Sequence, residues 1–150
     1  MSPSEGERLD VEEAIARLQI ALRLQYRAAL GYTLGAGSVV GFSYQHLGDA
    51  LWHFAELELA DTRRLVEKIV TLGVEPTTEI APLCFSASPP ELIDLLIENE
   101  EEATEALQGC IAPTGREAGS EAIEHRMEHM IMRKQEQIDL LKRVRRDPGA

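Results

Sequence analysis

Glu58-Leu-Ala-Asp61 places two acidic residues three positions apart within an apolar helical pattern. Residues three, four and seven positions apart lie on one face of an α-helix, so Glu58 shares its face with Leu51, Ala55 and Leu65. Asp61 lies one turn further along the same face. A charged group on a buried helical face is tolerated only when it is paired and hydrogen-bonded. The stretch therefore predicts polar partners on neighbouring helices.

The composition predicts an all-α protein. Apolar residues make up 44% of the 150 residues, charged residues 27% and aromatic residues only 5%, which is typical of helices packed on helices. A chain of this length is long enough to bury a core and is expected to form one domain over residues 1–150. We expect four helices, at about 10–36, 43–72, 89–111 and 117–146.

Local signals set these boundaries. Asp10 and Glu13 form a capping-box pattern, Gly73 suits the end of a helix, and Pro113-Thr-Gly115 interrupts the chain before the last helix. The stretch from 75 to 88 has no helical period and is long for a connection in a compact domain. Such a connection can run the length of a bundle. The sequence therefore predicts two antiparallel helical hairpins joined by a long crossover between the second and third helices.

Each predicted helix carries polar residues inside its apolar stripe. On the third helix the stripe is centred on Asn99, and Glu102 lies about 60° away at ~100° per residue, so the sequence leaves open which of the two faces the centre. Tyr32 shares a face with the polar residue of the first helix. The predicted polar core consists of Gln25, Glu58, Asp61, Asn99, Lys134 and Gln137, with Tyr32 and Glu102 nearby.

Three segments resemble the ferritin-like superfamily, including its bacterioferritin and rubrerythrin relatives. They are Gln25-Tyr-Arg-Ala-Ala-Leu-Gly-Tyr32, the run 58–73 and Gln137-Ile-Asp-Leu-Leu141. The resemblance implies a ferritin-like four-helix bundle of bacterial type. In that family one Glu from the first helix of each hairpin and a Glu-x-x-His motif from each second helix bind two metals. The family's Glu positions would fall on Gln25, Glu58, Asn99 and Lys134, and its His positions on Asp61 and Gln137.

The resemblance therefore implies a degenerate di-iron site. Amides are weak ligands, and Lys134 could supply the positive charge that metals would otherwise supply to Glu58 and Asp61. We expect no bound metal or other cofactor, and a protein that has lost ferroxidase chemistry and acts as a metal-free binding or structural subunit. A haem is disfavoured because Leu59 stands where bacterioferritins carry an axial Met.

Two alternatives remain open. One is a metal-independent enzyme that uses Glu58, Asp61 and Lys134, because a carboxylate pair beside a desolvated lysine can shift pKa values. The other is a residual oxidoreductase that holds Fe, Mn or Mg weakly at Glu58, Asp61 and Glu102, since oxygen ligands suit hard ions. His125 and His129 have two-ligand spacing but face away from Lys134.

Charge and cysteine content restrict partners and location. A net charge of −11 argues against nucleic acid, and no apolar run is long enough for a membrane span. The N-terminus lacks a signal-peptide core, so we expect a cytoplasmic protein in which Cys84 and Cys110 are reduced. The resemblance implies a homodimer or higher homo-oligomer, with Trp52 at the interface or, equally, under the crossover. No small-molecule ligand is indicated.

Overall fold

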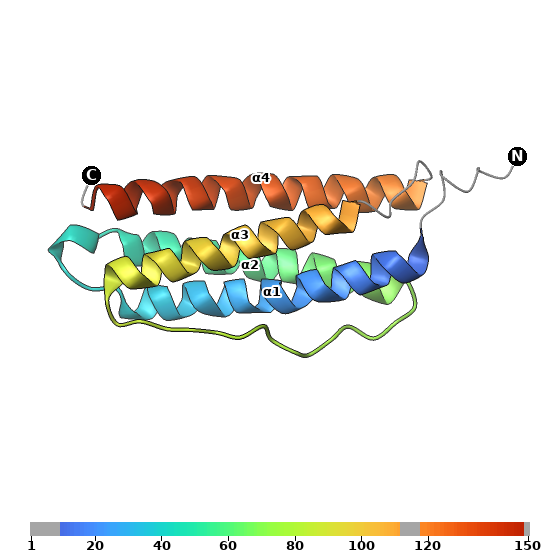
Figure 1. The fold of residues 1–150 in the computed structure, drawn as a ribbon, viewed down its shortest axis with the longest axis horizontal. Helices are drawn as coiled ribbons and strands as arrows, with labels where there is room; N and C mark the ends of the chain where they lie inside the picture. Colours follow the sequence, from blue (N-terminus) through green and yellow to red (C-terminus); the bar gives the residue numbers. More distant parts are fainter. Residues whose placement is uncertain (1–9, 112–117, 149–150) are drawn as a thin grey trace, which may run out of the picture.

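Four long helices form the bundle in the computed structural model, which describes residues 10–111 and 118–148. They are α1 (Val11–Ser38), α2 (Leu47–Thr71), α3 (Pro89–Ile111) and α4 (Ala118–Arg146), with a short 3-10 helix η2 (Phe42–Tyr44) before α2. Within the described residues there is no strand. Figure 1 shows the four long helices side by side, with the connection between α2 and α3 running along the outside of the bundle. The predicted all-α bundle with a long crossover is therefore confirmed.

The helix ends follow local chemistry and depart from the expected bounds in two places. Asp10 caps α1, because its carboxylate accepts a hydrogen bond from the backbone N–H of Glu13 at 3.2 Å. The helix continues through Gly35 and Gly37 to Ser38 instead of ending near residue 36. α2 begins at Leu47 instead of near residue 43, because the chain first makes the separate turn η2. The expected break at 113–115 and helix start at 117 lie outside the described residues.

The crossover is fixed to α1 by side-chain and backbone hydrogen bonds. Gln19 donates to the carbonyl of Glu75 at 2.8 Å and accepts from the N–H of Thr77 at 2.8 Å. The Tyr26 hydroxyl donates to the carbonyl of Thr77 at 2.9 Å, and Arg27 donates to the carbonyl of Pro82 at 3.3 Å. These contacts satisfy backbone groups that an extended connection would otherwise leave to solvent.

Two large apolar clusters fill the bundle, one toward each end, and a smaller one of Leu24, Ala81 and Ala103 lies at the crossover. The first contains buried side chains such as Leu18, Leu65, Leu107 and Met127, and the second contains Tyr32, Leu51, Leu96 and Leu141. Along every helix the buried charged residues and the buried glutamines lie between the residues of these two clusters. The polar layer is therefore closed off by apolar packing above and below it.

The described residues include no helix that combines the length and apolar character needed to cross a membrane. The exposed faces of the helices instead carry many charged side chains, several of which form surface ion pairs.

Candidate functional site

A buried lysine lies between two buried carboxylates at the centre of the bundle. Lys134 Nζ is 2.8 Å from Glu58 Oε2 and 2.9 Å from Glu100 Oε1. The side chains of Lys134 and Glu58 are 0% exposed and that of Glu100 is 1% exposed. One ammonium on α4 therefore joins a carboxylate of α2 to a carboxylate of α3.

Gln137 makes a second bridge between the same two carboxylates. Its Nε2 lies 2.7 Å from Glu58 Oε1 and 2.7 Å from Glu100 Oε2, and 3.4 Å from the Tyr32 hydroxyl. Gln25 Nε2 donates to the Glu58 carboxylate and to the Glu58 carbonyl. All four carboxylate oxygens of Glu58 and Glu100 thus accept a hydrogen bond, as the burial of charge requires. We call Gln25, Glu58, Glu100, Lys134 and Gln137 the ion-pair core.

The structure brings Glu100 into this core in place of Asn99. Asn99 is only half-buried, and Glu102 is exposed on the surface, where it forms an ion pair with Arg27 at 2.9 Å. The expectation that Asn99 or Glu102 faces the centre is therefore wrong. The buried face of α3 overlaps the expected stripe but is turned from Asn99 toward Glu100, and it consists of Leu92, Ile93, Leu96, Glu100, Ala103, Leu107 and Cys110.

A signal for Glu100 was present in the sequence. Glu100 lies seven positions after Ile93, four after Leu96, three before Ala103 and seven before Leu107. Those are the spacings of one helical face. The many glutamates of α3 obscured it, because an acidic segment is usually a solvated face.

Asp61 is buried but belongs to a separate ion pair. Its Oδ1 accepts from Arg133 Nη1 at 2.9 Å, and Asp61 is only 3% exposed. Lys134 is expected from the sequence to neutralise Asp61 as well as Glu58, but the structure assigns that contact to Arg133. Burial raises the pKa of Asp61, while the positive charge of Arg133 acts in the opposite direction.

The three residues of the expected weak metal site do not converge. Glu58 is directed into the ion-pair core, Asp61 pairs with Arg133, and Glu102 lies at the surface with Arg27. Among residues 10–111 and 118–148, no group of three or more His, Cys, Asp or Glu side chains is arranged to hold a metal ion. His125 and His129 are both exposed on α4.

Burial and mutual charge shift the protonation equilibria of the ion-pair core. Desolvation raises the pKa of Glu100 to about 7, together with the nearby negative charge of Glu58 and against the positive charge of Lys134. Desolvation alone would lower the pKa of Lys134, but the charges of Glu100 and Glu58 and its hydrogen bonds to both raise that pKa well above its ordinary value. Lys134 therefore stays protonated near neutral pH.

Tyr32 borders the ion-pair core and stays neutral. Desolvation raises the pKa of its hydroxyl well above the ordinary value, and the negative charges of Glu100 and Glu58 add to the effect. Its ring also packs edge-on against Phe54, with ring centroids 5.4 Å apart. Tyr32 thus joins the polar core to the apolar cluster that lies beyond it.

Comparison with known protein families shows which family this chain belongs to. The ferritin-like domain family matches residues 15–147. The chain belongs to the ferritin-like family. The match covers most of α1, the whole of α2, α3 and α4, and the crossover. No curated protein matches the chain.

Solved structures show the same fold. A ferritin-like, diiron-carboxylate protein from Bacillus anthracis str. Ames superposes with a TM-score of 0.83 at 24% identity, covering 90% of this chain and 96% of its own. Rhodobacter capsulatus bacterioferritin, solved with a metal-free dinuclear site and haem iron, superposes with a TM-score of 0.78 at 17% identity. That match covers 87% of this chain and 82% of the bacterioferritin chain. This ferritin-like protein therefore shares the bundle architecture over most of its length.

Proposed function

We propose that this ferritin-like protein has replaced di-metal chemistry with an internal ion pair, and that it acts as a metal-free binding or structural subunit of a homo-oligomer. The observation that carries the proposal is the position of Lys134 Nζ between Glu58 and Glu100. In the di-metal carboxylate bundles, one Glu from each of two helices and a Glu-x-x-His motif from each of the other two bind the metals. Here the matching positions would be Gln25 and Glu100, Glu58-x-x-Asp61, and Lys134-x-x-Gln137.

Charge balance supports this assignment. The family's four glutamates would supply four negative charges, whereas the ion-pair core contains two carboxylates and one ammonium. A divalent cation placed between Glu58 and Glu100 would meet the buried positive charge of Lys134 and would have to displace it. Displacement would leave an ammonium unpaired in the interior, at a cost of several kcal/mol. The lysine therefore competes directly with metal for the two retained glutamates.

The protonation state of Lys134 weighs against the alternative of a metal-independent enzyme. A nucleophilic or basic lysine needs a lowered pKa, as in a desolvated site without carboxylate partners. The pKa of Lys134 is instead raised, and its side chain is completely buried. These observations support a structural ion pair over a catalytic amine.

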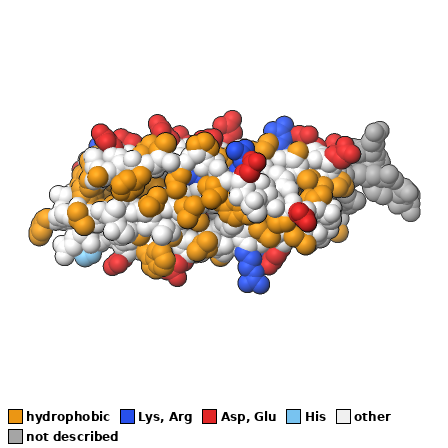
Figure 2. All heavy atoms as spheres, turned by 90° about the horizontal axis from the view of Figure 1, so that it is seen from below, with side chains coloured by type: hydrophobic (Ala, Val, Ile, Leu, Met, Phe, Trp, Pro, Cys, Tyr) orange, Lys and Arg blue, Asp and Glu red, His pale blue; other side chains and the backbone are white. Residues whose placement is uncertain are grey.

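The surface of the first hairpin supports self-association. Leu30, Leu59 and Ile80 are exposed, and they line a shallow apolar depression of about 320 Å³ between α1, α2 and the crossover. Figure 2 shows hydrophobic side chains spread along the face that carries α1 and the crossover. Members of this family commonly oligomerise, and an apolar face of this kind marks a protein interaction site. Trp52, half exposed on α2, could extend this interface.

Restoring the ligands tests the proposal. The double variant Lys134→Glu, Gln137→His supplies a Glu-x-x-His motif to face Glu58 and Glu100. We expect Mn²⁺ to raise the melting temperature of this variant and to leave that of the wild-type protein unchanged. Lys134→Met, which removes the ammonium without adding a ligand, is the matched control. Equal stabilisation of the wild-type protein and the double variant by Mn²⁺ would contradict the proposal.

A further inference from the structure

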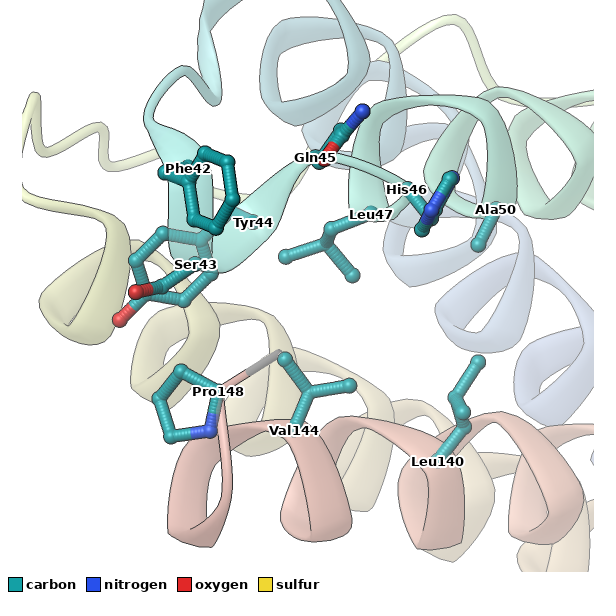
Figure 3. A pocket seen from close by; sticks show the side chains of 10 residues that line it. All are labelled: Phe42, Ser43, Tyr44, Gln45, His46, Leu47, Ala50, Leu140, Val144 and Pro148. Atoms are coloured by element: carbon teal, nitrogen blue, oxygen red, sulfur yellow. The ribbon is translucent and has the colours of Figure 1, made fainter. Parts of the chain in front are cut away.

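A second, independent feature lies at the end of the bundle where α4 finishes and α2 begins. The segment 42–47 and the last turns of α4 enclose a groove of about 540 Å³. Figure 3 shows Leu140 and Val144 of α4 facing Leu47 across this groove, with Phe42 and Tyr44 at one end. Phe42 is 93% exposed, which is unusual for a side chain of its size. The volume lies within the range of about 300–1,000 Å³ that is typical of small-molecule sites.

The groove is apolar along its α4 wall, whereas the opposite wall also contributes Ser43, Gln45 and His46. Leu140 and Val144 lie one turn apart on α4 and form a row along one side, and Pro148 lines the groove just beyond the end of the helix. One row of side chains opposite the segment 42–47 suits a single extended hydrocarbon chain better than a pair of chains.

A cation without a partner lies beside this row. A smaller depression of about 210 Å³ shares Leu140 and Val144 with the groove and is also lined by Arg143, Arg146 and Asp147. The last turns of α4 carry the basic cluster of Lys142, Arg143, Arg145 and Arg146. Among the described residues, Lys142 pairs with Glu101, Arg145 with Asp94 and Arg146 with Asp147. Arg143 is the member of this cluster that forms no ion pair with any described residue. In a protein of net charge −11, this unpaired guanidinium marks a place where an anion is favoured.

We propose that the groove binds a fatty acid, with its acyl chain between Leu47 and the row of Leu140 and Val144 and its carboxylate at Arg143. The site is separate from the ion-pair core and does not depend on whether that core binds metal. A groove with one apolar wall, adjoining a depression that holds an unpaired guanidinium, matches the chemistry of a single-chain carboxylate, because guanidinium binds carboxylate in a bidentate manner.

Calorimetric titration with dodecanoate tests the proposal, with dodecanol as the uncharged probe of the same chain. The wild-type protein is expected to bind dodecanoate saturably. Arg143→Gln is expected to weaken dodecanoate binding about tenfold while leaving dodecanol binding unchanged, since a hydrogen bond to a charged group contributes about that much. Lys142→Gln makes the same charge change in the same cluster and is expected to bind dodecanoate like the wild-type protein. Val144→Asp is expected to lose both ligands.

Three results would overturn the assignment. The first is the absence of saturable dodecanoate binding to the wild-type protein. The second is wild-type affinity in Val144→Asp, which would place the ligand elsewhere, for example in the depression beside Leu59. The third is unchanged dodecanoate affinity in Arg143→Gln together with a change in oligomeric state in Val144→Asp, which would make the groove a contact between copies of this chain.

Discussion

Lys134 Nζ and Glu100 Oε1 lie 2.9 Å apart across the α3–α4 hairpin, and both side chains are almost fully buried. Together with Glu58, this contact places an organic cation between two carboxylates of the ferritin-like bundle. Apolar clusters enclose the group on both sides, so solvent cannot replace either partner. The stability of the protein should therefore depend on keeping these charges together.

Removing the ammonium should destabilise the fold strongly. Lys134→Met leaves two facing carboxylates without their cation, and breaking a buried ion pair in this way costs about 3–5 kcal/mol. Urea unfolding of the variant measures the loss. Lys142→Met, which breaks only the exposed pair with Glu101, is the control and should cost no more than about 1 kcal/mol. If both variants lost the same small amount of unfolding free energy, the charge of Lys134 would not be needed for the stability of the fold.

Removing the charge of a partner as well should recover part of that loss. In Lys134→Met, Glu100→Gln the second carboxylate is replaced by an amide, so only Glu58 keeps a buried negative charge. The double variant should be more stable than Lys134→Met alone, because the effects of substitutions within one ion-pair network on the free energy of unfolding do not add. A double-mutant cycle by urea unfolding gives the coupling energy between the two side chains. Additive losses would mean that the two side chains are not coupled.

The free energy of unfolding should depend on pH through Glu100. Its folded-state pKa is raised to about 7, so the native protein holds a proton that the unfolded chain releases near its ordinary value of 4.5. This contribution is fully present below pH 4.5 and is lost as the pH rises through 7. The groups that face Glu100 are Lys134, Glu58 and Tyr32, and Lys134 stays charged throughout this window.

Glu100→Gln removes this titration without removing the hydrogen-bonding side chain. Between pH 5 and 8, the stability of the wild-type protein should fall relative to that of the variant, as measured by urea unfolding at each pH. The difference isolates Glu100 from the other acidic groups, which are present in both proteins. Parallel pH profiles would show that Glu100 has an ordinary pKa.

The apolar face of the first hairpin should govern self-association. Leu59→Lys places a charge on that face, beside Leu30 and Ile80, and, under the proposed self-association, should lower the sedimentation coefficient measured by sedimentation velocity. Met132→Lys is the matched control, because Met132 is equally exposed but lies on α4. If Leu59→Lys keeps the wild-type sedimentation coefficient, this face does not form the interface.

The sequence predicted the bundle and most of its polar centre because both follow from helical periodicity. Gln25, Glu58, Lys134 and Gln137 are each the polar residue inside an otherwise apolar stripe, and the structure buries all four. Glu100 was missed because α3 carries apolar residues on adjacent faces, so a rotation of less than one position toward Glu100 leaves the stripe almost equally apolar. Only packing against α1 and α4 selects between these two rotations.

The partner of Asp61 was missed for a different reason. Arg133 lies at the edge of the α4 face, and a long side chain from a boundary position can reach a buried carboxylate while its own Cα stays outside. Helical periodicity predicts which way a residue faces on its helix, but it does not predict how far a long side chain extends. For the same reason the sequence did not indicate that Arg27 would extend to Glu102 and to the crossover.

Iron binding by the wild-type protein is the most direct test of the account. The purified protein is incubated with Fe²⁺ and O₂, oxidation is followed by absorbance, and retained iron is measured after desalting. Because Lys134 occupies the place of a cation between Glu58 and Glu100, we expect no retained iron and no oxidation faster than in buffer. Rapid oxidation with two irons retained per chain, as a functional di-iron centre would give, would contradict the central claim.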